Sequence, residues 1–208
     1  MKLVCLDLEG VLVPEIWIRF AEETGVEELR LTTRDIPDYD QLMRHRIEIL
    51  ASNGFRLSDI QDVIARIDPY PGAKAFLDHL REHTQAVLLS DTFQEFAGPL
   101  MQKLDRPTLL CNELVVDQDD AIVDFRLRQR NGKEQAVRGF QDMGLEVTAV
   151  GDSYNDLSML RQAHRGALFC PPDTIRRDHG DMPAFDSYDA LLSFLLHERE
   201  LSEERAQR

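Results

Sequence analysis

The chain begins with a short apolar segment, Leu3 to Leu6, that is followed at once by Asp7 and, two residues later, by Glu9. A short continuous apolar run of this kind is typical of a strand buried on both faces of a parallel sheet. In open α/β sheets, ligands bind at the carboxyl ends of the strands. The pattern therefore predicts two carboxylates at a ligand-binding edge, although two solvated acids in a surface turn would also fit these residues alone.

A long helical stretch is predicted before any second strand. Apolar residues recur at helical spacing in three segments, residues 15–24, 40–51 and 58–67. A connection between parallel strands normally needs a single crossover helix of about a dozen residues, so this stretch is longer than a simple crossover. We therefore predict an inserted helical cap at 14–69 and an α/β core domain made of 1–13 and 70–208.

Strands and helices alternate after residue 72. Apolar runs predict strands at 85–89, 108–111, 146–150 and 166–170, the last of these being the final strand. Two further short strands, 114–116 and 121–127, flank an acidic turn and predict a β-hairpin. The alternation predicts an α/β fold with a doubly wound, parallel, Rossmann-like sheet, to which the cap and the small hairpin are added. The charged tail, 197–208, is predicted to be a solvated helix end.

The composition limits the classes of partner. The chain has 208 residues, a net charge of −14 and a pI near 4.8, which argues against a nucleic-acid partner because phosphate backbones require a basic face. No segment approaches the roughly 18 continuous apolar residues of a membrane span, and the first residues do not resemble a signal peptide. We therefore expect a cytoplasmic protein with a small-molecule substrate and no membrane partner. The oligomeric state is left open.

The residues with metal-binding chemistry show no cluster in the sequence. Cys5, Cys111 and Cys170 are scattered, and each lies in an apolar run, which predicts small buried thiols rather than disulfides or metal ligands. The six histidines lie in polar helix or loop surroundings without ligand spacing. Carboxylates are therefore the expected metal ligands.

Polar residues end three of the predicted strands. Asp7, Ser90 and Asp152 each follow a different apolar run, and Lys133 begins a predicted helix. Because strand ends of a parallel sheet meet at one edge, we expect these side chains to converge. Crowded carboxylates repel each other, and Mg²⁺ resolves that conflict because it binds carboxylates together with phosphate oxygens. The set predicts phosphoryl transfer, with a carboxylate as nucleophile and a hydroxyl and a lysine around the phosphate.

Four short motifs resemble those of the haloacid dehalogenase-like hydrolases, in order and each at a strand or helix end. They are Asp7-Leu-Glu9-Gly-Val-Leu, Ser90-Asp91-Thr92, Lys133 and Gly151-Asp152-Ser-Tyr-Asn155-Asp156. Any single motif is weak evidence, but the ordered set is specific and spans residues 7–156.

The resemblance implies a role for each matching residue. It implies that Asp7 is the nucleophile, that Glu9 is the general acid and base, and that Asp7, Asp152 and the backbone carbonyl of Glu9 bind Mg²⁺. Asp156 is expected behind the metal. The residues expected around the phosphate are Ser90, Asp91, Lys133 and Asn155.

The position of the cap, between the first two motifs, is similar to that in the phosphoserine phosphatase branch. Glu15 and Arg46 resemble the residues that bind the amino and carboxylate groups of phosphoserine there. The chain looks most like bacterial members that hydrolyse phosphoserine and also transfer its phosphoryl group to homoserine. Simpler interpretations are that Arg46 is a solvated helical residue and that Glu15 caps a helix.

Two residues depart from the family pattern. Glu9 stands where the family usually has Asp, and Asp91 stands where related phosphatases often have Gly. The extra methylene of Glu9 moves its carboxylate by roughly an ångström or more, so we hypothesise that it favours an alcohol acceptor over water. The alternatives are a phosphatase of the same fold for another small phosphate ester and a phosphorylated signalling receiver, which would lack a cap.

Overall fold

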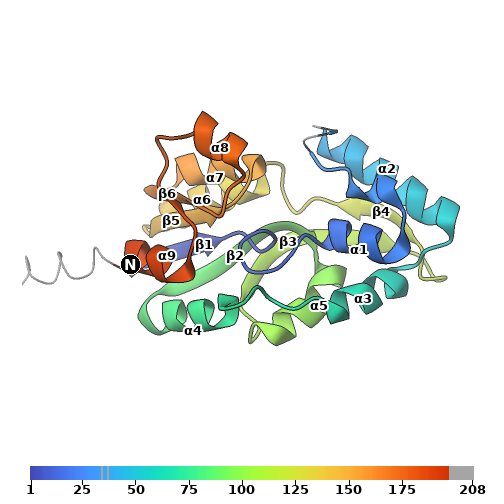
Figure 1. Cartoon of the computed structure of the whole chain (residues 1–208), viewed down its shortest axis with the longest axis horizontal. Coiled ribbons are helices and arrows are strands. Elements are labelled where there is room, and N and C mark those ends of the chain that lie inside the picture. The colour runs from blue at the N-terminus through green and yellow to red at the C-terminus, as the bar shows by residue number, and fades with distance from the viewer. Residues whose placement is uncertain (34, 37, 197–208) are drawn as a thin grey trace, which may run out of the picture.

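The structure is a computed structural model that describes residues 1–33, 35–36 and 38–196. A central sheet is covered by helices on both faces, and a further group of helices lies at one end of the molecule (Figure 1). The predicted charged tail, 197–208, lies outside the described residues. None of the described helices is long and apolar enough to cross a membrane.

The sheet has seven strands in the order β4-β3-β2-β1-β5-β6-β7. Their bounds are β1 Lys2–Leu6, β2 Gln85–Phe93, β3 Thr108–Val116, β4 Ile122–Arg126, β5 Glu146–Gly151, β6 Arg165–Phe169 and β7 Ala184–Phe185. All neighbouring pairs are parallel except β3 and β4. The doubly wound sheet is therefore confirmed, but β6 is not its last strand, because β7 pairs with it in parallel.

The two faces of the sheet bury separate hydrophobic clusters. Val4 and Leu6 point to one cluster, whereas Leu3 and Cys5 point to the other, as expected for the alternation of side chains along a strand. The first face is covered by α4 (Ala73–His83), α5 (Gln94–Lys103) and α9 (Tyr188–Leu196). The second is covered by α6 (Gly132–Asp142), α7 (Leu157–Gln162) and α8 (Asp173–Asp178). Burial on both faces explains why β1 is continuously apolar.

The residues between β1 and α4 form α1 (Ile16–Thr24), the 3₁₀ helix η1 (Glu27–Arg30), α2 (Tyr39–Asn53) and α3 (Leu57–Arg66). Their buried side chains belong to the same hydrophobic cluster as α5 of the core. The rings of Trp17 and Phe96, for example, meet edge to face with their centroids 5.6 Å apart. The cap is thus packed directly on the core, and its predicted boundaries stay a prediction.

The predicted hairpin is an extension of one long strand. The segments expected at 108–111 and 114–116 are both part of β3, which pairs antiparallel with β4. Its turn reaches the cap, where the backbone oxygen of Asp120 accepts from Leu57 N at 3.0 Å and its carboxylate accepts from Ser58 N at 2.9 Å. The hairpin therefore satisfies backbone donors at the start of α3.

Strand β2 carries an irregularity where it meets the site. Its pairing with β3 runs from Leu89 opposite Leu110 to Phe93 opposite Asn112, so four steps on β2 match two on β3. Ser90, Asp91 and Thr92 thus lie opposite a single residue of β3, Cys111. A bulge of this kind turns side chains out of the regular alternation, often beside active sites.

The prediction of three buried cysteines is only partly correct. Cys5 is buried in β1 and Cys111 is half-buried, but Cys170 is exposed. Strand β6 ends at Phe169, so Cys170 begins a loop, and its φ of 44° is left-handed. An apolar run in the sequence therefore extended one residue beyond its strand.

Candidate active site

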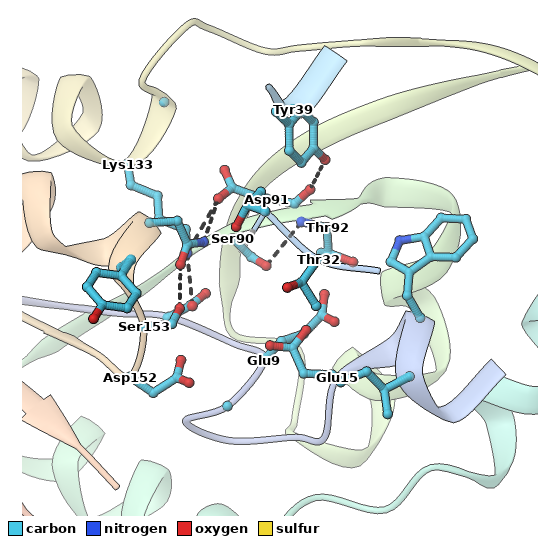
Figure 2. A pocket seen from close by; sticks show the side chains of 18 of the residues that line it. Glu9, Glu15, Thr32, Tyr39, Ser90, Asp91, Thr92, Lys133, Asp152 and Ser153 are labelled. Atoms are coloured by element: carbon cyan, nitrogen blue, oxygen red, sulfur yellow. Dashed lines mark hydrogen bonds and ion pairs between the residues drawn. The ribbon is translucent and has the colours of Figure 1, made fainter. Parts of the chain in front are cut away.

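A cleft of about 1370 Å³ lies at the carboxyl ends of β1, β2 and β5 (Figure 2). Asp7 follows β1, Ser90 and Asp91 come from the bulge of β2, and Asp152 follows β5. This is the edge where the strand order reverses, since the chain passes from β1 to β2 on one side and β5 lies on the other. The cap contributes Glu15 and other residues to the opposite wall.

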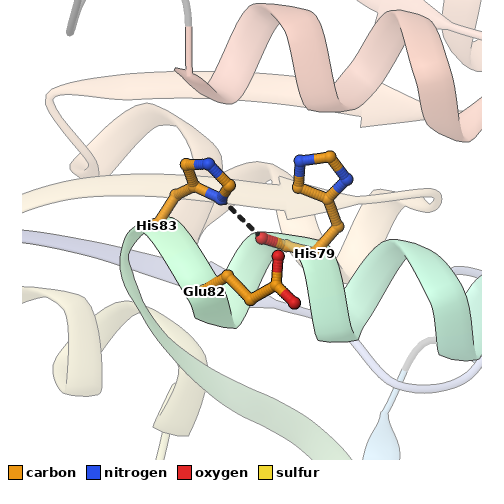
Figure 3. Close-up of side chains that lie close together, drawn as sticks. All are labelled: His79, Glu82 and His83. Carbon is orange, nitrogen blue, oxygen red and sulfur yellow. Dashed lines mark hydrogen bonds between the residues drawn. The ribbon is translucent and has the colours of Figure 1, made fainter.

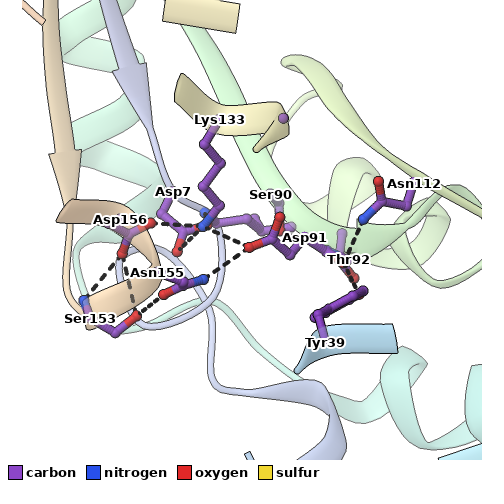
Figure 4. A network of polar contacts seen from close by, with 12 residues as sticks. Asp7, Tyr39, Ser90, Asp91, Thr92, Asn112, Lys133, Ser153, Asn155 and Asp156 are labelled. Carbon is purple, nitrogen blue, oxygen red and sulfur yellow. Dashed lines mark hydrogen bonds and ion pairs between the residues drawn. The ribbon is translucent and has the colours of Figure 1, made fainter. Parts of the chain in front are cut away.

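Lys133 joins the acidic residues of the site (Figure 4). Its ammonium nitrogen lies 2.9 Å from Asp7 Oδ2, 2.7 Å from Asp156 Oδ1 and 3.7 Å from Asp91 Oδ2. Lys133, Asp7 and Asp156 are all buried. A buried lysine in this position offsets the repulsion between carboxylates that come from two different strands.

The charged side chains around Lys133 shift one another's pKa values. Burial raises the pKa of Asp7 well above its usual range, and Asp156 raises it further, while Lys133 acts in the opposite direction. Burial alone would lower the pKa of Lys133, but the neighbouring carboxylates, Asp156 first among them, hold it well above its ordinary value. Lys133 is therefore a fixed positive charge beside the Asp7 carboxylate.

Two glycines leave room for the acidic side chains. A Cβ placed on Gly10 would lie 2.3 Å from Cγ of Asp152, and one on Gly151 would lie 2.3 Å from Cγ of Asp156. Asp156 also accepts from the backbone nitrogens of Asp152 and Ser153 at 3.0 and 3.1 Å. Both carboxylate oxygens of Asp156 thus have hydrogen-bond donors within the protein, as expected for a residue that holds the neighbouring side chains in place.

The donor set fits a magnesium ion. Carboxylate oxygens of Asp7, Asp152 and Asp156 lie within 4.8 Å of one another, and Lys133 is paired with two of these residues, Asp7 and Asp156. Three crowded acids with one paired lysine leave negative charge in excess, which a hard, oxygen-seeking cation offsets. Asp156 is held by Lys133 and two N–H groups, and Asp7 is held by Lys133 and the backbone nitrogen of Leu8, so the assignment of the ion to Asp7 and Asp152 stays a prediction.

A second group of potential ligands lies outside the cleft. His79, Glu82 and His83 come together on the exposed side of α4, contrary to the expectation that the histidines form no cluster (Figure 3). The ring Nδ1 of His83 lies 2.9 Å from the backbone oxygen of His79. Helical spacing brings positions i, i+3 and i+4 to one face, so this proximity follows from the helix alone.

Glu9 has a different environment from Asp7. Its Oε2 accepts a hydrogen bond of 2.8 Å from the backbone nitrogen of Ile16, the first residue of α1. Glu15 does occupy the N-cap position of α1, as the simpler interpretation has it, but its side chain makes no capping hydrogen bond. Burial, together with the charge of Glu15, raises the pKa of Glu9 to about 8. Figure 2 shows the two acids beside each other near the start of α1.

Arg46 is not the solvated residue of the simpler interpretation. Its side chain is buried in the cap, with the guanidinium carbon 4.5 Å from the centre of the Trp17 ring. Nη2 donates to the backbone oxygen of Leu31 at 2.8 Å, and Nε has no hydrogen-bond partner among the described residues. Burial lowers its pKa to about 10, which still leaves a full positive charge at neutral pH. Arg46 is therefore a buried cation on the cleft wall.

The remaining predicted residues, Ser90, Asp91 and Asn155, also line the cleft. Ser90 Oγ accepts from the backbone nitrogen of Thr92 at 3.2 Å and is buried. The carboxylate of Asp91 accepts from Asn155 Nδ2 at 3.0 Å, which joins the second and fourth motifs across the cleft. The bulge thus points its hydroxyl and carboxylate toward the same region as Lys133.

Two residues near the site, Tyr39 and Asn112, were missed in the sequence, and Thr92 was part of a motif but was given no role. Tyr39, the first residue of α2, donates its hydroxyl to the backbone oxygen of Asp91 at 2.9 Å. Asn112 of β3 donates to the same oxygen at 3.1 Å, and Thr92 has a buried hydroxyl that lines the cleft. Only the polar character of Asn112 within an apolar run could have drawn attention to it. Tyr39 carries no local signal, whereas Thr92 stands in the second motif.

The fold and the site define the class of protein. The sequence pattern of the haloacid dehalogenase-like hydrolases matches residues 6–161, and the chain belongs to this family. It is 53% identical to phosphoserine phosphatase ThrH of Pseudomonas aeruginosa over 191 residues, which cover 92% of this chain and 93% of that protein. It is 52% identical to a phosphoserine phosphatase of Pseudomonas syringae, covering 92% and 81%. A crystal structure of an apo phosphoserine phosphatase matches with a TM-score of 0.75 at 24% identity, covering 93% and 97%.

Proposed function

We propose that the protein is a magnesium-dependent phosphatase of O-phosphoserine that also transfers the phosphoryl group to homoserine. The observation that carries this proposal is the Asp7–Lys133 pair, 2.9 Å apart, beside Asp152 at the point where the strand order reverses. The names of the two similar Pseudomonas proteins support the choice of phosphoserine. A signalling receiver needs no enclosed cleft, and here the cap packs over one.

The first half-reaction forms an aspartyl phosphate. The Asp7 carboxylate attacks phosphorus as the ester P–O bond breaks, and the proton of Glu9 passes to the leaving serine oxygen. A pKa of about 8 leaves Glu9 mostly protonated at neutral pH, as a general acid requires. Lys133 and the Ser90 hydroxyl offset charge on the transferring group. Mg²⁺, held by Asp7, Asp152 and the Glu9 carbonyl, would neutralise phosphate charge.

The second half-reaction regenerates the enzyme. Glu9, now a carboxylate, takes a proton from the acceptor hydroxyl as its oxygen attacks phosphorus and the bond to Asp7 breaks. With water the products are phosphate and the free enzyme, and with homoserine the product is phosphohomoserine. Homoserine is longer than serine by one methylene, and Glu9 is longer by one methylene than the Asp of the usual family pattern.

The amino-acid part of the substrate is assigned to the cap wall. The Arg46 guanidinium would bind the carboxylate of phosphoserine, and Glu15 would bind its ammonium group. Serine and homoserine share this amino-acid group, so the same two residues serve the donor and the acceptor. Support comes from the buried charge of Arg46 and from the position of Glu15 on the same cleft.

The test is an assay of phosphoserine turnover with and without homoserine, following free phosphate and phosphohomoserine. We expect magnesium-dependent release of phosphate, new phosphohomoserine when homoserine is added, and loss of both in Asp7→Asn. Arg46→Ala should raise KM for phosphoserine more than for an ester that lacks the amino-acid group. Equal effects on both esters would point to another small phosphate ester, and no turnover at all would refute the proposal.

A further inference from the structure

The cleft carries far more negative than positive charge. Among the described residues that line it, eight are aspartates or glutamates, whereas only Arg46, Arg130 and Lys133 are cationic. The chain as a whole has a net charge of −14. An anionic phosphate ester therefore approaches a cleft whose own field opposes its entry.

Two of the three cations are already engaged deep in the cleft. Lys133 is buried and paired with Asp7 and Asp156 at 2.9 and 2.7 Å. Arg46 is buried over Trp17 and donates to the backbone oxygen of Leu31. Neither charge is displayed at the entrance, because burial and bound partners restrict each of them to the interior.

Arg130 differs from both in its exposure. It lies between β4 and α6, is solvent-exposed and borders the cleft. Within the described part of the chain it has no hydrogen bond or ion pair. Its neighbour Arg128 anchors the loop, since its backbone nitrogen donates to Asn112 Oδ1 at 3.1 Å and its Nη2 donates to the oxygen of Gly132 at 2.9 Å. An anchored loop thus presents Arg130 at the margin of the site.

We propose that Arg130 captures the anionic substrate at the mouth of the cleft, before the phosphate reaches Lys133 and the metal site. The inference rests on the proposed function in that its ligand is a phosphate ester. The mechanism is electrostatic attraction, which raises the local concentration of the dianion and acts on binding rather than on chemistry. Because Arg130 is exposed, salt screens its charge.

The matched pair of variants is Arg130→Gln and Arg126→Gln. Both remove one exposed arginine from the same part of the chain, but Arg126 does not line the cleft. At low salt we expect Arg130→Gln to lower kcat/KM for phosphoserine about fivefold, the attraction of a dianion to one charge about 8 Å away in water. We expect kcat to stay unchanged, the loss to vanish near 1 M salt, and Arg126→Gln to resemble the wild type.

A second measurement separates this inference from the proposed function. The dissociation constant of inorganic orthophosphate, measured by calorimetry with magnesium, should rise by a similar factor in Arg130→Gln at low salt. It decides the role of Arg130 even if phosphoserine is not turned over, a result that would refute only the proposed function. Equal effects of both variants, a loss that persists unchanged at high salt, or unchanged orthophosphate binding would each overturn the capture role.

Discussion

Single glycines decide whether the acidic side chains of this site fit together. Gly10 has a φ of 80°, and an added Cβ would lie 2.3 Å from Cγ of Asp152. Gly151 is in contact with Asp156 in the same way. The motif glycines therefore have a steric role, because each allows a carboxylate to lie directly against the backbone, between two loops at Gly10 and within one segment at Gly151.

The variant Gly10→Ala tests this steric role. We expect it to displace Asp152 and to raise the magnesium concentration for half-maximal activity by about tenfold or more. Gly144→Ala is the control, because Gly144 also has a φ of 80° but an added Cβ would meet nothing within 4 Å. Both variants should lose about 1 kcal/mol of unfolding free energy from the left-handed backbone. A normal magnesium dependence in Gly10→Ala would contradict the prediction.

Glu9 offers a second test at the scale of one residue. Shortening it in Glu9→Asp should weaken its bond to the Ile16 nitrogen and favour the smaller acceptor, water. We expect the ratio of phosphohomoserine to free phosphate to fall, by up to about 10²-fold. Glu15→Asp, which shortens the neighbouring acid, should raise KM for both amino acids but leave the ratio unchanged when homoserine is saturating. An unchanged ratio in Glu9→Asp would refute the link between Glu9 and acceptor choice.

Among the elements, the attachment of the cap to the core depends on the end of α3. The Lys103 ammonium of α5 donates to the backbone oxygens of Ala65 and Ile67 at 2.9 and 2.7 Å and to the Asp68 carboxylate at 2.8 Å. Carbonyl groups at the end of a helix lack partners within the helix, and a cation is favoured there. Lys103 thus binds the backbone where the chain passes from the cap back into the core.

Removing this contact should loosen the cap without touching the cleft. We expect Lys103→Met to lower the free energy of unfolding by about 1–2 kcal/mol, because charge-assisted hydrogen bonds are lost. Lys74→Met is the control. The partners of Lys74 among the described residues are two side chains at the surface, Asp78 and Asp105, so its effect should be smaller. Denaturant unfolding gives both values. Equal losses of unfolding free energy in the two variants would contradict the prediction that the hydrogen bonds at the end of α3 stabilise the protein more than a surface ion pair does.

For the whole molecule, magnesium should act as a stabilising ligand. The acids of the site come from β1, β5 and the segment after β5, so an ion bound between them joins parts of the fold that separate on unfolding. At a concentration 100 times its dissociation constant, the ion should add about 2.7 kcal/mol to the free energy of unfolding. Thermal unfolding with magnesium and after chelation measures this gain. The gain should disappear in Asp152→Asn, and a full gain in that variant would place the ion elsewhere.

The sequence by itself determined the fold class and the main chemical groups of the site. Continuous apolar strands and helical periodicity are local signals, and the carboxyl-edge rule then places Asp7, Ser90 and Asp152 near one another. Lys133 was expected from its place at a helix start. The roles of these residues stay a prediction, although the structure does bring them to one cleft.

Only the tertiary structure decided how these groups are held and which further residues join them. The bulge in β2, the bond from Tyr39 to Asp91 and the bond from Ile16 to Glu9 depend on pairing between segments that have no shared period in the sequence. The same holds for Arg130. In the sequence it is one of several arginines, and only its position beside the cleft distinguishes it. Helix and strand propensities depend on residues that are neighbours in the sequence, whereas burial and charge balance depend on how the whole chain packs.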